Sequence, residues 1–99
     1  TASVGVIIPT AYEEKSEVVV KCLEKVIKEI DKWDITTDET KLLGVDALNA
    51  SSVDYLIRAY CNPGDQWTLK REILSYVKDI FDKEGIKIPY NQLEVHNGE

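Results

Sequence analysis

The chain has 99 residues and a net charge of −6, which fits one folded domain and disfavours nucleic acid or anionic lipid as a partner. No apolar run approaches the roughly 18 residues that a membrane helix needs, and no signal peptide opens the chain. The sequence starts at Thr1 and contains no methionine. We therefore expect a single domain over residues 1–99, excised from a larger protein, so that any membrane contact lies in the missing part.

The first third of the chain predicts a strand and then a helix. Residues 4–12, VGVIIPTAY, are apolar and rich in β-branched side chains, which is typical of a buried strand. Pro9 cannot donate to a strand ladder, so we expect it at the end of this strand. From about residue 15 to 32, apolar residues recur at the three-and-four spacing of one helix face.

The middle of the chain predicts a hairpin. Residues 41–49, KLLGVDALN, alternate weakly and should place Leu43, Val45 and Ala47 on one face. Residues 53–61 alternate more clearly, with Val53, Tyr55, Ile57, Ala59 and Cys61 on one face. A short Asn-Ala-Ser connection joins the two strands, so we expect them to pair as antiparallel neighbours.

The last third predicts a second helix and a closing strand. Asp65 is placed to cap the helix with its side chain, and apolar residues recur at helix spacing from Leu69 to Phe81. Gly85 follows where a left-handed residue ends a helix. Ile86 and Ile88 should pack on the core, and residues 93–95 should form the last strand.

The resulting order is strand, helix, strand, strand, helix, strand. Two helices can cover only one face of a four-stranded sheet, so we expect a ferredoxin-like α+β sandwich with a mainly antiparallel sheet. The first and third strands should lie in the centre of the sheet, with the second and fourth at its edges.

Groups that could carry chemistry are few and scattered. His96 is the only histidine and has no other ligand at metal-binding spacing, so we interpret it as a surface residue. The acid pairs 13–14 and 38–39 lie in polar stretches where water keeps both carboxylates ionised. Cys22 and Cys61 are interpreted as buried free thiols, and Trp33 and Trp67 as the edge of the core. We predict no catalytic group, no metal and no cofactor.

The second half of the chain carries a resemblance to a known family. The stretches LNASSVDYLIRAYCNPGD and ILSYVKDIFDKEGIKIPYNQLEVHN resemble the cytoplasmic C-terminal domain of the small-conductance mechanosensitive channel (MscS) family. VIIPTAYEEKSEVVVKCLEKVI resembles its first strand and helix more loosely. Asn91 and Tyr60 stand where proline and tryptophan are common in the family. The positions that carry the pattern, and that we take as candidate interface residues, are Ser51, Ser52, Arg58, Tyr60, Gly85, Ile88, Pro89, Tyr90 and Gln92.

The resemblance implies a role in a channel and not in catalysis. Members of the family are homo-heptamers that open a transmembrane pore under membrane tension and release ions and small solutes after osmotic downshock. The resemblance places the full-length protein in a bacterial or archaeal inner membrane and this domain in the cytoplasm, where it forms part of a hollow cage that filters solutes. The isolated fragment is compatible with a monomer.

Two other functional interpretations are compatible with the same fold. An ACT-type regulatory module would bind a small molecule between subunits, but it needs a glycine-bearing loop after the first strand, which PTAYEEKS lacks. An acylphosphatase-like enzyme needs an arginine and an anion-binding loop beside the first strand, and the loop here is acidic. Ligand-induced thermal shifts would distinguish the first alternative, and a phosphatase assay the second.

Overall fold

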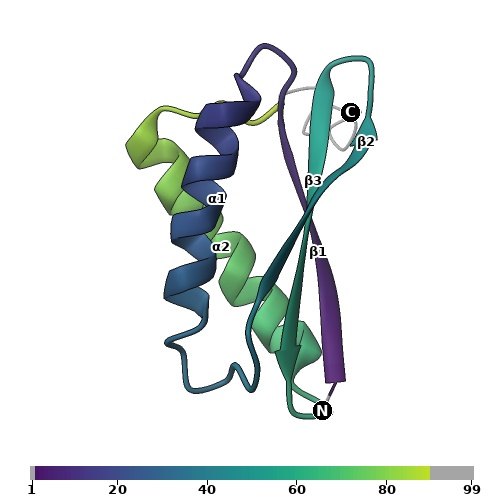
Figure 1. Cartoon of the computed structure of the whole chain (residues 1–99), viewed down its shortest axis with the longest axis vertical. Coiled ribbons are helices and arrows are strands. Elements are labelled where there is room, and N and C mark those ends of the chain that lie inside the picture. The colour runs from purple at the N-terminus through teal and green to yellow at the C-terminus, as the bar shows by residue number, and fades with distance from the viewer. Residues whose placement is uncertain (1, 90–99) are drawn as a thin grey trace, which may run out of the picture.

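A computed structural model describes residues 2–89 as two layers, with both helices on one face of a sheet (Figure 1). The radius of gyration is 13.7 Å, which is what a folded chain of about this length has. The elements in chain order are β1 (Ala2–Ala11), α1 (Ser16–Ile30), β2 (Lys41–Leu48), β3 (Ser52–Cys61) and α2 (Gln66–Glu84).

The described sheet has three strands in the order β1-β3-β2, and both pairings are antiparallel. The central place of the third strand and the edge place of the second are therefore confirmed. Within residues 2–89, β1 has a partner on one side only. The predicted fourth strand, residues 93–95, lies outside the described residues, as do Tyr90, Gln92 and His96.

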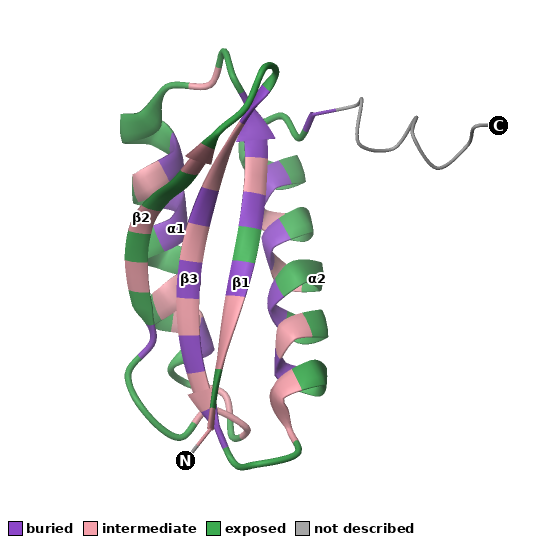
Figure 2. Ribbon diagram, turned by 90° about the vertical axis from the view of Figure 1, so that its right-hand side faces the viewer, coloured by how far each residue is buried: buried purple, intermediate pink, exposed green. Residues whose placement is uncertain are grey.

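The core forms between the sheet and the helix layer because β3 alternates strictly. Its residues Tyr55, Ile57, Ala59 and Cys61 face the helices and are each at most 2% exposed, as the sequence predicts. The intervening side chains lie on the helix-free face, and Figure 2 shows the resulting banding along the strand. Fully burying one such aliphatic side chain contributes about 1.5–3 kcal/mol to folding.

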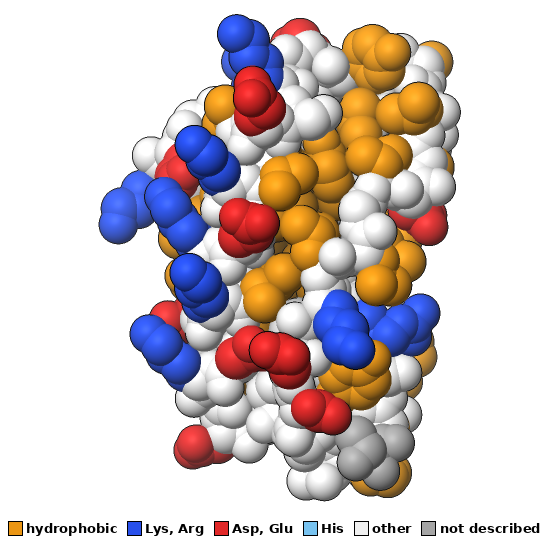
Figure 3. Space-filling view, viewed as in Figure 1, with side chains coloured by type: hydrophobic (Ala, Val, Ile, Leu, Met, Phe, Trp, Pro, Cys, Tyr) orange, Lys and Arg blue, Asp and Glu red, His pale blue; other side chains and the backbone are white. Residues whose placement is uncertain are grey.

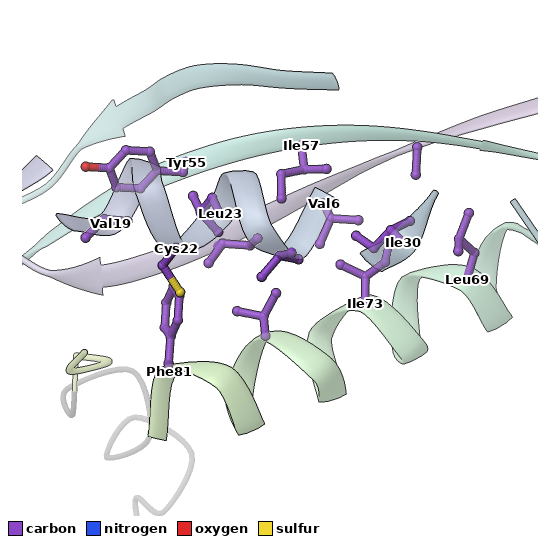
Figure 4. Packing of buried hydrophobic residues seen from close by; sticks show 14 of the residues in the cluster. Val6, Val19, Cys22, Leu23, Ile30, Tyr55, Ile57, Leu69, Ile73 and Phe81 are labelled. Atoms are coloured by element: carbon purple, nitrogen blue, oxygen red, sulfur yellow. The ribbon is translucent and has the colours of Figure 1, made fainter. Parts of the chain in front are cut away.

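Both helices bury one narrow stripe against this layer (Figure 4). Packing holds the three consecutive valines of α1 in a helix despite their low propensity, since Val19 is fully buried. Trp33 packs edge-on against Tyr76 at 5.9 Å between ring centroids, so its predicted place at the core edge is confirmed. The buried helix residues are Val19, Cys22, Leu23, Val26, Ile30, Leu69, Ile73, Val77 and Phe81.

Two predictions about the ends of elements were wrong. Pro9 lies inside β1, opposite Asp54, and the strand continues to Ala11. The missing N–H of proline removes one backbone donor without ending the strand. Asp65 is the N-cap of α2, but its backbone is in the right-handed helical region at φ −96° and ψ 0°, and its side chain makes no capping bond. Side-chain capping requires an extended N-cap residue.

The faces of β2 also differ from prediction. Val45 pairs with Tyr55 on the helix side of the sheet, whereas Ala47 pairs with Asp54 on the helix-free side. The register shifts twice, between Leu42 and Gly44 and between Val45 and Ala47. Each shift inserts a residue and reverses the alternation, so the predicted common face of Leu43, Val45 and Ala47 is wrong.

Candidate assembly surface

The candidate residues fall into two groups. Ser51, Ser52 and the closing segment 85–89 meet at one end of the sandwich, because Ala11 pairs with Ser52 and donates its backbone N–H to the carbonyl of Lys87 at 2.9 Å. Arg58 lies further along β3, opposite Gly5, and Tyr60 lies opposite Ser3 near the other end. These residues therefore do not form one site.

The closing segment begins with a helix stop. Gly85 adopts φ 75°, the left-handed conformation expected at this position, and Ile86 donates its N–H to the carbonyl of Phe81 at 2.9 Å. Ile86 is 5% exposed and packs in the core as predicted, but Ile88 is 36% exposed, so its predicted core contact is wrong. Residues 86–89 form no regular strand, so the two side chains at i and i+2 do not share a face as they would in an extended segment.

The segment is held in place through Lys87. Its carbonyl accepts the Ala11 N–H, and its own N–H donates to Oε2 of Glu14 at 2.9 Å. Pro89, two residues later, is buried. The path of the chain from α2 back along the end of β1 is thus fixed by hydrogen bonds and burial, which sequence reasoning missed because the partners are more than 70 residues apart.

The serine pair fixes the turn at the same end. Ser52 is 3% exposed, and its Oγ accepts a bond from Nδ2 of Asn49 at 3.1 Å. The same Asn49 amide donates to Oδ2 of Asp54 at 3.1 Å. The carbonyl of Ser51 accepts the N–H of Tyr12 at 3.2 Å, so the hairpin turn is tied to the β1–α1 loop. These contacts are structural and contain no activated nucleophile.

Arg58 and Tyr60 lie on the helix-free face of the sheet. Arg58 donates through Nη1 to Oγ of Ser3 at 3.3 Å, across the β1–β3 pair. Both residues are half-buried, with Leu56 and Ile7 beside them on the same face. This face can meet a partner, but its side chains offer no converging charged groups.

The titratable groups of the described part give no reactive centre. Burial raises the pKa of Cys22 from 9.0 to about 11, with a smaller contribution from the Glu84 carboxylate, and burial also raises the pKa of Cys61. Both thiols are buried and free, as predicted. A raised pKa removes the thiolate that reactivity requires. No cluster of possible metal ligands occurs among residues 2–89.

One open pocket lies between α1 and the segment before β2. It is lined by Glu24, Ile27, Lys28, Asp31, Glu39 and Thr40, and its volume is about 420 Å³. Four of these six side chains are charged and exposed to water, which is unlike the apolar lining of small-molecule sites. The pocket belongs to a wider surface feature described below.

Comparison with known proteins identifies the protein family of this chain. Residues 4–88 match the family described as "Mechanosensitive ion channel MscS, C-terminal". The chain therefore belongs to the MscS family, as a C-terminal domain. Within the described residues, neither helix combines the length and apolar character needed to cross a bilayer.

Relatives and a solved structure agree with this assignment. The chain is 29% identical over 90 residues to an uncharacterised MscS family protein of Buchnera aphidicola subsp. Acyrthosiphon pisum, covering 91% of this chain and 29% of that protein. It is 26% identical to the small-conductance mechanosensitive channel of Edwardsiella ictaluri, over 94% of this chain and 32% of the channel. It thus spans about a third of these relatives.

The fold is shared with a channel of known structure. The closed-state crystal structure of Helicobacter pylori MscS aligns with a TM-score of 0.73 at 20% identity, covering 89% of this chain and 34% of that one. At this identity the likeness establishes the fold. The candidate interface residues themselves are not distinguished by it.

Proposed function

We propose that the chain is the cytoplasmic cage domain of an MscS-type mechanosensitive channel that releases ions and small solutes after osmotic downshock. The observation that carries the proposal is the family match over residues 4–88, which includes both helices, β2, β3 and most of β1. The full-length protein would be an inner-membrane homo-heptamer, in which this single domain shapes a wall and performs no catalysis. The ferredoxin-like arrangement would be completed by a fourth strand on the free edge of β1.

Survival after downshock tests this proposal. The full-length protein, expressed in cells that lack their own mechanosensitive channels, should restore survival after transfer to dilute medium. A matched control lacks residues 4–88 and should restore survival poorly. If both proteins insert normally into the membrane and neither restores survival, the proposal is contradicted.

The closing segment is proposed to set how neighbouring subunits meet. Lys87 is fixed to Ala11 and Glu14, and Pro89 is buried and has a restricted φ, so the chain leaves the sandwich in a defined direction. Combined Pro89→Ala and Tyr90→Ser substitutions in the full-length channel should lower the fraction of assembled oligomer and alter gating. If assembly and gating stay normal, the closing segment is a rigid turn and does not set how subunits meet.

Net charge is proposed to filter solutes. Seven copies with a net charge of −6 each would place negative charge around a small vestibule, where focusing of the field enriches cations. Asp38 and Glu39 are exposed and have carboxylates available to contribute to such a field.

A further inference from the structure

An apolar surface remains open between α1 and β2. Val45 and Leu48 pair with Tyr55 and Val53, so they lie on the helix side of the sheet, yet they are 51% and 68% exposed. Figure 3 shows a continuous apolar band between the charged side chains of α1 and the sheet. We call this surface the α1–β2 seam; its apolar members are Val20, Ile27, Leu42, Val45 and Leu48.

The seam has an acidic end. The pocket described above opens there, with the carboxylates of Glu24, Asp31 and Glu39 and the single ammonium of Lys28 around Ile27. A partner that fits the seam should therefore present apolar side chains together with positive charge.

The strand edge at the seam is not suited to pairing with another strand. The two register shifts of β2 interrupt the regular row of backbone groups, and bulges are a common device against edge-to-edge pairing. Gly44, at the first shift, has φ 105°. A partner would thus dock through side chains and not by extending the sheet.

The first half of α2 carries the complementary surface. Trp67 is 70% exposed, so its predicted place at the core edge is wrong, and Leu74 is 38% exposed. Lys70 and Arg71 lie on the same helix face at i+3 and i+4 from Trp67, and the Lys70 ammonium is 5.6 Å from the centre of the Trp67 ring. Neither basic side chain has an ion-pair partner among residues 2–89. We call these four residues the α2 knob.

The seam and the knob lie on opposite flanks of the domain. Figure 2 shows α1 and β2 on one side of the sandwich and α2 beside β1 on the other, in agreement with the helix–strand contacts. Two different complementary patches on one chain produce a head-to-tail contact, and repetition of that contact closes into a ring when the rotation permits.

We propose that the α2 knob of one copy of this chain docks on the α1–β2 seam of the next copy. Trp67 and Leu74 cover the exposed leucine and valine side chains of β2, and Lys70 and Arg71 meet the acidic end of the seam. Tryptophan and arginine are the side chains most enriched where binding energy concentrates. This inference rests on the proposed function, because it identifies the surfaces by which the channel subunits would meet at this domain.

Cysteine cross-linking in the full-length protein tests the contact directly. The pair Val45→Cys and Leu74→Cys places one thiol on the seam and one on the knob, whereas Cys22 and Cys61 are buried and should stay unreacted. Under mild oxidation the double variant should give a ladder of covalent multimers, and each single variant should give none. The control pair V45C and K83C moves the second thiol to the other end of α2 and should also give none.

The other outcomes separate the two proposals. In one such outcome, the double variant forms an oligomer of the same size as the unsubstituted protein and yet gives no covalent ladder, or only covalent dimers. That result overturns the seam–knob contact and leaves the channel assignment intact. A full-length protein that is monomeric by sedimentation overturns both.

A charge exchange provides the second test. R71E or E24R alone should lower the assembled fraction of the full-length protein, because each places like charges together at the contact. The double variant should restore that fraction. Failure of the double variant to recover, with both single variants folded, contradicts the proposed pairing.

Discussion

At the scale of single residues, burial and backbone conformation decide what each side chain does. Gly85 is required where φ is 75°, since a residue with a Cβ is strained in that region, and it releases Ile86 to enter the core. Cys22 lies in the same core cluster as Phe81 (Figure 4) and is 1% exposed. Its thiol is a packing group whose ionisation opposes folding.

The Cys22 thiol predicts a stability change at alkaline pH. In the unfolded chain it ionises near its ordinary pKa of 9.0, whereas in the folded chain its pKa is about 11. Between these values the unfolded state loses the proton first, so the free energy of unfolding falls as the pH rises, by up to about 1.4 kcal/mol per pH unit from this group. Denaturant titrations from pH 8 to 11 measure this slope.

The control for this prediction is Cys22→Ala. That variant should be less stable at neutral pH, because it leaves a small cavity, but its unfolding free energy should depend less steeply on pH. A residual slope is expected from Cys61 and Tyr76, whose pKa values burial also raises. An identical slope in Cys22→Ala and the original chain would contradict the assignment.

At the scale of elements, long-range contacts determine how the segments join. The closing segment is held to β1 by two hydrogen bonds to Lys87, one from Ala11 and one to Glu14. The bond to Glu14 has a charged acceptor, and removing such a bond costs about 1.5–3 kcal/mol. The segment should therefore open more easily when that carboxylate is absent.

Glu14→Ala should speed amide hydrogen exchange at Ala11 and Lys87 by tenfold or more, because the two bonds support each other. Glu13→Ala is the matched control: Glu13 is the exposed neighbour, and no bond to the closing segment is recorded for it among the described residues. Of the two variants, only Glu14→Ala should change the rate of amide hydrogen exchange at Lys87. Equal effects of both substitutions would mean that the carboxylate does not hold the segment.

The elements themselves follow largely from local sequence pattern. The helix stripes, the hairpin and the strict alternation of β3 are readable because each depends on neighbours within a few residues. The faces of β2 are not, since its two bulges depend on register with β3. Ile88 and Trp67 were misplaced for a similar reason: an apolar side chain is buried only where the rest of the fold covers it.

The candidate surface was only partly predictable. Gly85 and Pro89 mark the closing segment in the sequence, but the tie between Lys87 and Glu14 joins positions 73 residues apart. The α2 knob was detectable in principle, because Trp67, Lys70, Arg71 and Leu74 share one helix face by spacing alone. The α1–β2 seam was not detectable from the sequence, because its exposure depends on where α1 lies relative to β2.

At the scale of the whole molecule, net charge gives a test of filtering. Asp38→Lys changes the charge of each copy by two units at an exposed position in the loop just before β2. In a vestibule that focuses the field, this should shift the reversal potential of the full-length channel away from cation preference at low salt. Asp79→Lys, an equal change on the exposed side of α2, is the control, and identical shifts would argue against local focusing.

The account as a whole rests on this chain being a wall domain of a channel that membrane tension opens. Patch-clamp recording of the full-length protein in a membrane free of other mechanosensitive channels is the most direct test. We predict stepwise currents that appear as suction increases the tension and disappear when it is released. A correctly inserted, assembled protein that stays silent up to rupture of the patch would contradict the account.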